Sequence, residues 1–196
     1  MAEPALATSP GSARRAASPA AAVDAWAPSR DARRYARQRR LARDLVELSR
    51  LERGLERAEC VAVDLASLVR AIAADYPELV VDGGAAAIVQ SDSRRIARIL
   101  FALLDNAFLH GAPPVRLRYD ADAIVVCDAG RGFAPRVLAH VSEPFVAGAR
   151  AWPRGAGLGL AIAARQAALL GATLAVANAP DGGARATLQF AAHASR

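Results

Sequence analysis

The sequence contains no lysine, because all 25 of its basic side chains are arginine. Any phosphate group that the chain binds must therefore be contacted by arginine side chains, by backbone N–H groups or by a metal ion. Cysteine is also scarce: Cys60 and Cys127 stand in separate apolar stretches, in neither a CxxC pair nor a cluster with histidine. This spacing argues against a zinc site and predicts two reduced, buried thiols, as in a cytosolic protein.

Long apolar runs are missing too, although 54% of the residues are hydrophobic. No run reaches the roughly 18–20 residues that a membrane span needs, and the N-terminus lacks the basic and then apolar order of a signal peptide. We therefore expect a soluble, cytoplasmic protein without a membrane span. Its 196 residues suffice for one domain of ordinary size and an extension.

Positive charge is concentrated near the N-terminus. Residues 1–40 contain eight arginines and three acidic residues, a net charge of +5, whereas the whole chain carries +6. No DNA-binding motif accompanies these arginines, so nucleic acid is not favoured as a partner. A solvated basic tail and helix is the simplest interpretation, and a contact with an acidic partner surface is the next.

The chain divides into three regions by composition. Residues 1–29 are rich in Ala, Pro and Ser, and we expect them to be disordered because they have few large apolar groups. Residues 30–58 form the second region, in which a helix of about 31–57 carries leucines along one face. Such a stripe predicts burial against a partner helix or a second copy of the chain. Residues 59–192 form the folded domain.

The pattern of this domain predicts strands and helices in mixed order. The expected strands are 61–64, 79–81, 87–89, 115–119, 123–127, 173–178 and 184–190, and the expected helices are 65–75, 92–109, 135–140 and 158–170. The strands 79–81 and 87–89 lie across a turn at 82–84, and a turn at 120–122 makes a hairpin of the next two. Strands with helices on one face predict an α+β fold, a two-layer α/β sandwich, preceded by a long N-terminal helix.

Two motifs carry polar groups suited to a nucleotide. Asn106 lies on the apolar side of the expected helix 92–109, and its carbonyl oxygen is a hard ligand of the kind that Mg²⁺ prefers. Alone, Asn106 is more simply explained as a hydrogen-bonded amide near a helix end. Asp128 ends an apolar strand before Gly130 and Gly132; its carboxylate can accept the exocyclic N–H of adenine, and glycines let the backbone lie flat against the base. DxGxG alone is a common turn signature.

A third motif, residues 154–162, places glycines at 155, 157 and 159 directly before an apolar helix. The N–H groups and the positive dipole end of such a helix form a cradle for phosphate. The motif is neither a Walker pattern, since no GK[ST] follows, nor part of a Rossmann unit.

In this order the motifs resemble the ATP-binding domain of two-component sensor histidine kinases, which has the Bergerat fold. Asn106, the DxGxG stretch, Glu143–Pro144–Phe145 and the GxGLGL stretch resemble that family's N, G1, F and G2 boxes. Residues 48–54 and 63–65 are similar to the end of its second dimerisation helix and to the link into its catalytic domain. The resemblance therefore covers residues 31–190.

This resemblance implies ATP and Mg²⁺ as cofactors, with Asn106 as the Mg²⁺ ligand and Asp128 as the adenine anchor. The residues implied to contact the nucleotide are Asn106, His110, Asp128, Gly130, Gly132, Phe145, Gly155, Gly157, Leu158, Gly159 and Leu160. Residues 140–154 would form a mobile lid that Phe145 packs down, and Arg150 or Arg154 would neutralise the triphosphate during catalysis.

The sequence also departs from the family pattern. Ala102 replaces the asparagine usual four residues before the Mg²⁺ ligand, and Phe108 and Leu109 stand where a basic residue is usual. These changes imply weaker metal and phosphate binding, and Ala102 argues against vigorous ATP hydrolysis. No histidine precedes His110, so the phosphoacceptor of a sensor kinase is not evident in this chain.

We therefore predict the catalytic domain of a histidine kinase, an ATP-dependent phosphotransferase that donates the γ-phosphate of ATP to a histidine on a partner chain. Its partners would be a histidine-bearing dimerisation or phosphotransfer protein and a downstream response regulator, and the helix 30–58 could form a homodimer. Two alternatives remain open. One is an ATP-binding pseudokinase that regulates a partner, and the other is an anti-sigma-type serine kinase on the same fold.

Overall fold

The computed structural model describes residues 30–83, 86–146 and 156–191. Its helices are α2 (Arg30–Glu52), α3 (Leu65–Ala73), α4 (Ser93–His110), α5 (Pro135–Leu138) and α6 (Gly159–Leu169). Its strands are β1 (Val61–Asp64), β2 (Leu79–Asp82), β3 (Ile88–Ser91), β4 (Val115–Tyr119), β5 (Ala123–Cys127), β6 (Thr173–Asn178) and β7 (Ala184–Gln189). The described residues from 40 onward form one compact unit, which holds the second half of α2 and every later element, and residues 30–39 fall outside it.

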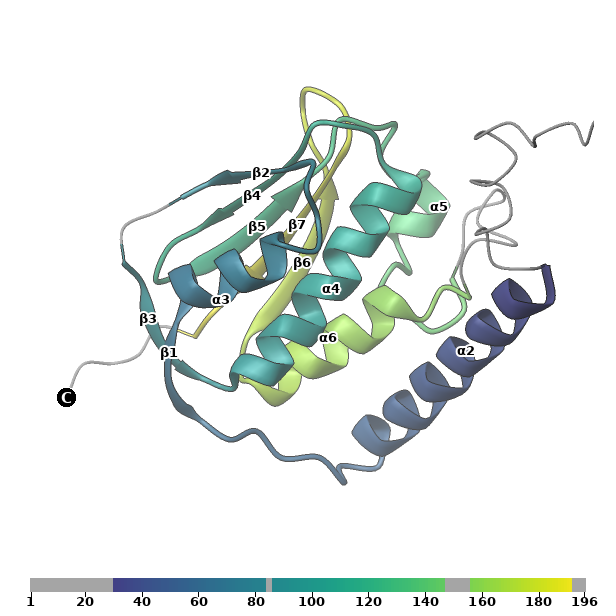
Figure 1. Cartoon of the computed structure of the whole chain (residues 1–196), viewed down its shortest axis with the longest axis horizontal. Coiled ribbons are helices and arrows are strands. Elements are labelled where there is room, and N and C mark those ends of the chain that lie inside the picture. Colours follow the sequence, from purple (N-terminus) through teal and green to yellow (C-terminus); the bar gives the residue numbers. More distant parts are fainter. Residues whose placement is uncertain (1–29, 84–85, 147–155, 192–196) are drawn as a thin grey trace, which may run out of the picture. The chain divides into compact units, whose positions relative to one another are not determined.

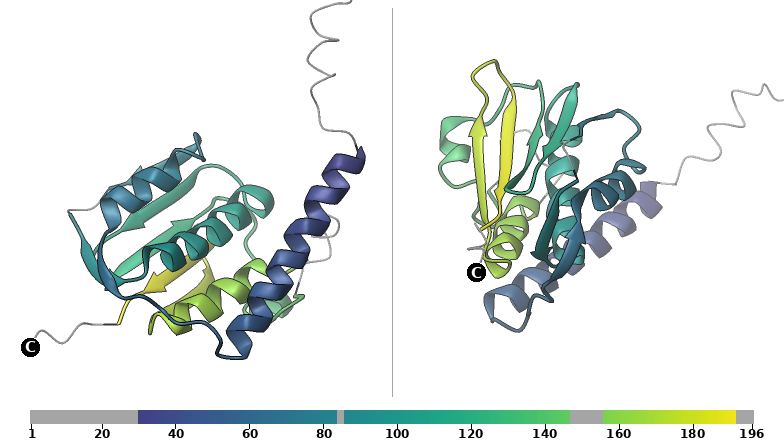
Figure 2. Two further views of the ribbon diagram at one scale, coloured as in Figure 1. Left: turned by 60° about the horizontal axis from the view of Figure 1, so that its bottom comes forward. Right: turned by 90° about the vertical axis from the view of Figure 1, so that its left-hand side faces the viewer.

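Five strands form one mixed sheet in the order β2-β4-β5-β7-β6. β2 runs parallel to β4, and the other neighbours are antiparallel. The helices α3, α4 and α6 lie on the same face of this sheet (Figure 1 and Figure 2). A helix precedes the domain, so the predicted α+β two-layer sandwich with its N-terminal helix is confirmed.

The strand β4 shows why the sheet takes helices on one face only. Its apolar side chains, Val115, Leu117 and Tyr119, are buried, whereas Arg116 and Arg118 are exposed. Successive side chains of a strand point to opposite faces, so the apolar set faces the helices and the arginines face solvent. The turn to β5 and the bounds of both strands agree with the predicted hairpin.

The long helix α4 forms the centre of the helical layer. Its N-cap is Asp92, whose carboxylate accepts hydrogen bonds from the backbone N–H groups of Arg94 at 3.0 Å and Arg95 at 3.4 Å. Its buried residues recur at helical spacing and are Ile96, Ile99, Leu100, Ala102, Leu103, Leu104 and Ala107. This burial packs α4 against the sheet and brings its C-terminal half beside the end of β5.

Two of the sequence predictions are wrong in detail. The helix α2 ends at Glu52, before the expected end at residue 57, because Gly54 has φ +65° and closes it. The N–H of Leu55 donates to Arg50 O at 3.0 Å and that of Gly54 to Leu51 O at 3.1 Å, the pattern of a Schellman cap.

The strands β2 and β3 do not pair across the turn at 82–84. β3 pairs with β1 in a separate antiparallel sheet, where Val63 lies opposite Val89 and both are buried. β2 joins the edge of the main sheet beside β4 instead. The segment between β2 and β3 is longer than the two-residue turn of a tight hairpin, so tertiary packing decides the pairing.

The cysteines and the helix lengths bear on two further expectations. Cys60 is exposed and Cys127 is half-buried, so the prediction of two buried thiols is wrong. Across the described ranges, no helix has both the length and the apolar character that crossing a membrane requires.

Candidate nucleotide-binding site

Asn106, Asp128 and Leu160 come together at one narrow cleft between α4, α6 and the sheet. Among the described residues, its lining is Leu103, Asn106, Ala107, Val126, Asp128, Phe133, Leu160, Val176, Ala184 and Ala186. The free volume of the cleft is about 10 Å³, which is close to the space that one water molecule needs. This space is smaller than a purine ring.

Asp128 is the buried charge of the cleft, with 8% of its surface exposed. Its Oδ1 atom accepts a hydrogen bond from Gly130 N at 2.8 Å, and its backbone N donates to Ala184 O at 3.1 Å. A buried carboxylate needs such donors, because desolvation disfavours an ionised group. The contacts hold the carboxylate at the end of β5 and direct it to the cleft.

Two glycines that the sequence motifs do not include make room for Asp128. A Cβ atom at Gly111 would lie 2.4 Å from Asp128 Cγ, and one at Gly183 would lie 1.8 Å from Asp128 O. Neither distance is compatible with a side chain. Gly111 is recognisable in the sequence only as a helix end and Gly183 only as a turn residue, so their importance comes from the tertiary contact.

Asn106 is half-buried on α4 and lines the cleft opposite Asp128. Its side-chain amide makes no hydrogen bond with any residue that the structure describes. The preceding residue, Asp105, is committed elsewhere: it accepts a hydrogen bond from Tyr76 Oη at 2.8 Å and pairs with Arg40. The Asn106 amide oxygen therefore remains available to a ligand, and it is of the hard oxygen class that suits Mg²⁺.

The loop after Asp128 has a conformation that requires glycine. Gly132 has φ +66°, a value that residues with a Cβ rarely adopt. A Cβ at Gly130 would lie 2.8 Å from Asp128 Oδ1 and 2.9 Å from Gly111 Cα. Phe133, which lines the cleft, is held by hydrogen bonds to the side chain of Asn178, a residue that sequence reasoning missed.

The start of α6 borders the opposite end of the cleft. Gly157 has φ +70°, and its carbonyl accepts a hydrogen bond from Phe145 N at 3.1 Å. Leu158 is buried, and a Cβ at Gly159 would have one neighbour within 4 Å, the Cβ of Ala102 at 4.0 Å. Within the described ranges, the space beside Gly159 is therefore open, as a phosphate cradle needs.

The other predicted site residues are distributed as follows. Phe145 has φ +63° and is 63% exposed, and His110 is exposed at the end of α4. Gly155, Arg150 and Arg154 lie outside the described residues.

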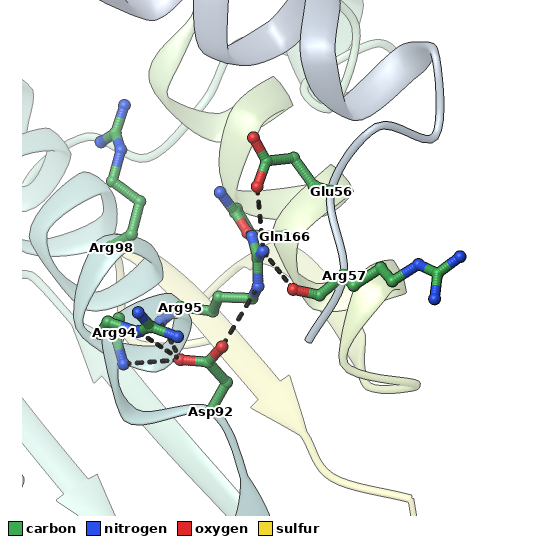
Figure 3. A pocket seen from close by; sticks show the side chains of 7 residues that line it. All are labelled: Glu56, Arg57, Asp92, Arg94, Arg95, Arg98 and Gln166. Carbon is green, nitrogen blue, oxygen red and sulfur yellow. Dashed lines mark hydrogen bonds and ion pairs between the residues drawn. The ribbon is translucent and has the colours of Figure 1, made fainter. Parts of the chain in front are cut away.

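A larger cavity, of about 400 Å³, lies away from Asn106 and Asp128. Arg95 of α4 meets Glu56, from the segment after α2, and Asp92, the N-cap of α4 (Figure 3). Arg95 Nη1 donates to Gln166 Oε1 at 2.8 Å, and Arg95 Nη2 donates to Glu56 Oε2 at 3.1 Å. Arg95 thus joins α4 to α6 and to the segment after α2 through a cluster of hydrogen bonds and ion pairs.

Sheet, helical layer and cleft together define an ATP-binding domain of the Bergerat type. A sequence model of the family described as "Histidine kinase-, DNA gyrase B-, and HSP90-like ATPase" matches residues 91–194, and the chain belongs to this family. Within this family, the chain is similar to sensor proteins and signal-transduction histidine kinases.

Three comparisons illustrate this. The sensor protein CseC of Streptomyces coelicolor is 42% identical over 151 residues, which are 76% of this chain and 30% of that protein. The ATP-binding domain of PrrB from Mycobacterium tuberculosis has 30% identity and a TM-score of 0.53, over 67% of this chain and 96% of that one. The histidine kinase AdeS of Acinetobacter baumannii shares the fold, with 21% identity and a TM-score of 0.67 over 89% and 91% of the two chains. The chain thus spans about 30% of the length of its curated relatives.

Proposed function

We propose that the cleft binds Mg·ATP with the adenine at Asp128 and the metal at Asn106. One observation carries this proposal: a buried carboxylate and an amide without a hydrogen-bond partner among the described residues line the same cleft. The carboxylate would accept the exocyclic N–H of adenine, a group that no other common base presents in the same place. Bound Mg²⁺ would neutralise charge that develops on the transferred phosphoryl group.

The remaining roles divide between the two ends of the cleft. Gly130 and Gly132 would give the base room, and Leu160 would contact its apolar surface. Gly155, Gly157 and Gly159, with Leu158, would place N–H donors at the phosphates. His110 and Phe145 would border the nucleotide, and Arg150 or Arg154 would offset the charge of the triphosphate.

The reaction we propose is transfer of the γ-phosphate of ATP to a histidine of a partner chain. The sensor kinase relatives support the reaction class. The bond from the γ-phosphorus to the bridging oxygen of ADP breaks as the bond to the imidazole nitrogen forms, and ADP leaves. The acceptor would be a histidine-bearing dimerisation or phosphotransfer protein that then serves a response regulator, and the helix α2 would mediate docking or homodimerisation.

A weak or absent kinase activity is the second candidate, and Ala102 favours it. This side chain is buried beside Gly159, at the phosphate end of the cleft, and it has no polar group. Nothing at this position can orient an attacking group by a hydrogen bond. A chain of this kind would bind ATP and regulate its partner through its conformation alone.

Labelling with γ-³²P-ATP in the presence of candidate histidine-bearing partners separates these functions. Acid-labile label on the partner, lost when Asn106 is replaced by Ala, supports the kinase. Saturable ATP binding with no transfer to any partner supports the regulatory module. Acid-stable phosphoserine contradicts both and points to a serine kinase on the same fold.

Metal dependence is tested by titrating ATP with Mg²⁺ and with EDTA. We expect EDTA to weaken binding to the wild-type chain and to have a smaller effect on Asn106→Ala, because the variant has already lost its metal contact. An equal effect of EDTA on both chains would contradict the assignment of Asn106.

A further inference from the structure

Asn178 fastens the loop that follows Asp128, although it lies 45 residues away from that loop in the sequence. It is the last residue of β6. Its Oδ1 atom accepts a hydrogen bond from Phe133 N at 2.7 Å, and its Nδ2 atom donates one to Phe133 O at 2.9 Å. One planar amide therefore pairs with both backbone groups of Phe133, as a neighbouring strand would.

This pair of hydrogen bonds has no substitute nearby. Among the residues that the structure describes, Arg131, Gly132 and Phe133 make no other hydrogen bonds. The loop also contains glycines at 130 and 132, which raise the conformational entropy that must be lost when it is ordered. Within the described part of the chain, the hydrogen bonds of residues 131–133 therefore come from a single side chain.

The hairpin of β6 and β7 also packs closely against Asp128 and the loop that follows it. A Cβ at Gly132 would lie 2.5 Å from Asn178 Oδ1, and one at Gly183 would lie 1.8 Å from the carbonyl oxygen of Asp128. The end of β6 and the turn into β7 thus lie directly against the segment 128–133. Phe133 lines the cleft together with Asn106 and Asp128, so a shift of the loop would change the cleft itself.

We propose that Asn178 is a positioning residue for nucleotide binding, which holds residues 130–133 in the conformation that receives the base. This inference rests on the proposed nucleotide site. Asn178 does not line the cleft and acts through Phe133. Without the amide, the loop populates other conformations, and the nucleotide must order it again on binding. Loss of two hydrogen bonds that order a loop corresponds to roughly tenfold weaker binding.

Three variants of the full chain test this. Asn178→Ala removes both hydrogen bonds. Asn178→Asp keeps the size and the acceptor but replaces the donor to Phe133 O by a second acceptor. The matched control is Gln189→Ala. Gln189 is the last residue of the neighbouring strand β7, and its Nε2 atom donates to Asp122 O at 3.0 Å. Like Asn178, it is an exposed side chain that bonds to the backbone of a residue distant in sequence.

Calorimetry with ATP and with ADP, and amide hydrogen exchange at Phe133, are the measurements. We expect Asn178→Ala to weaken the binding of ATP and the binding of ADP by the same factor, because the loop lies on the side of the cleft assigned to the base. The same variant should speed hydrogen exchange of the Phe133 amide. Asn178→Asp should also bind more weakly, whereas Gln189→Ala should bind as the wild type does.

Wild-type affinity in both Asn178 variants, or an equal loss in Gln189→Ala, would overturn the positioning role. A loss confined to ATP would do so as well, because it would place the effect at the phosphates. Absence of nucleotide binding by the wild-type chain would instead refute the proposed site and this inference with it. Exchange at Phe133 would then show separately whether Asn178 holds the loop.

Discussion

Glycine residues around Asp128 determine whether its carboxylate can lie in the cleft. Gly111 follows α4 directly, and its Cα is close enough to the loop that a Cβ at Gly130 would lie 2.9 Å from it. Gly111 has φ −86°, a value that any residue can adopt, so it is required for space and not for backbone freedom. A substitution there should therefore act on the position of the carboxylate.

We expect Gly111→Ala to weaken ATP binding at least tenfold, because its Cβ would lie 2.4 Å from Asp128 Cγ and 2.6 Å from Ala107 O. Overpacking of this kind also costs about 1–3 kcal/mol of stability. Gly171→Ala is the control. Gly171 has φ +67° and open space around its Cβ position, so this variant should lose about 1 kcal/mol of stability through backbone strain alone. Calorimetry and urea unfolding measure the two quantities. Unchanged ATP affinity in Gly111→Ala would contradict the account.

The stability of the helix α4 depends on its N-cap residue, Asp92. Burial disfavours the ionised form of Asp92, but the hydrogen bonds from the backbone of Glu59 and Arg95, and those from Arg94, outweigh it, so the pKa of Asp92 lies below its usual range. A carboxyl group whose pKa is lowered by folding stabilises the folded state at every pH above its pKa in the unfolded chain, which is about 4. This stabilisation is lost as the pH falls through its pKa in the folded chain.

Asp92→Asn keeps a capping oxygen and removes the charge. We expect it to lower the free energy of unfolding by about 1 kcal/mol at pH 7, through the helix dipole and the neighbouring arginines. The difference from the wild type should narrow as the pH falls below about 4. Urea unfolding across this pH range is the measurement. A difference that stays constant with pH would show that the charge of Asp92 does not act.

Two ion pairs join the second half of α2 to α4, and α2 supplies the cation of one and the anion of the other. Arg40 of α2 pairs with Asp105 of α4. Glu47 lies seven residues after Arg40 in α2, and it pairs with Arg98, which lies seven residues before Asp105 in α4. The two helices are therefore antiparallel at this contact, and the charges define one register. Leu48 is buried against Leu158 at the start of α6, and this packing connects the helix to the end of the cleft where we propose the phosphates.

Glu47 is the centre of this contact, since it accepts hydrogen bonds from Arg98 Nε at 2.8 Å and Gln166 Nε2 at 2.8 Å. We expect Glu47→Ala to cost about 1 kcal/mol, the scale of a partly exposed ion pair, and to increase hydrogen exchange in residues 40–52 of α2. Arg43→Ala, an exposed residue of the same helix, should leave exchange unchanged. Equal exchange in both variants would mean that the ion pairs do not hold the helix.

For the whole molecule, sequence patterns predicted those elements whose signals are local. Val115, Leu117 and Tyr119 alternate with arginines within the predicted strand 115–119, and Asp92 stands directly before α4, so these signals lie in the segments themselves. Pairing of β2 and β3 could not be predicted, because both are short and their partners are chosen by burial in the folded domain.

The candidate site was predicted only as far as its motifs reach along the chain. Asn106 and Asp128 belong to motifs, and the structure brings them to one cleft. Asn178 and Gly111 carry no such signal, because each matters through a contact with a residue distant in sequence. An exposed asparagine at a strand end is otherwise indistinguishable from a turn residue.

The most direct test of the account is calorimetry of Mg·ATP binding to the wild type, Asp128→Asn and Asp122→Asn. The side chain made by Asp128→Asn would have the same shape as Asp but could place an N–H donor against the N–H donor of adenine. Asp122→Asn is the control, because Asp122 lies in the turn at the other end of β5. Our prediction is saturable binding to the wild type and to Asp122→Asn, and binding at least tenfold weaker to Asp128→Asn, the scale of one lost hydrogen bond to a charged group. Equal affinity of all three chains, or no binding to the wild type at millimolar nucleotide, would contradict it.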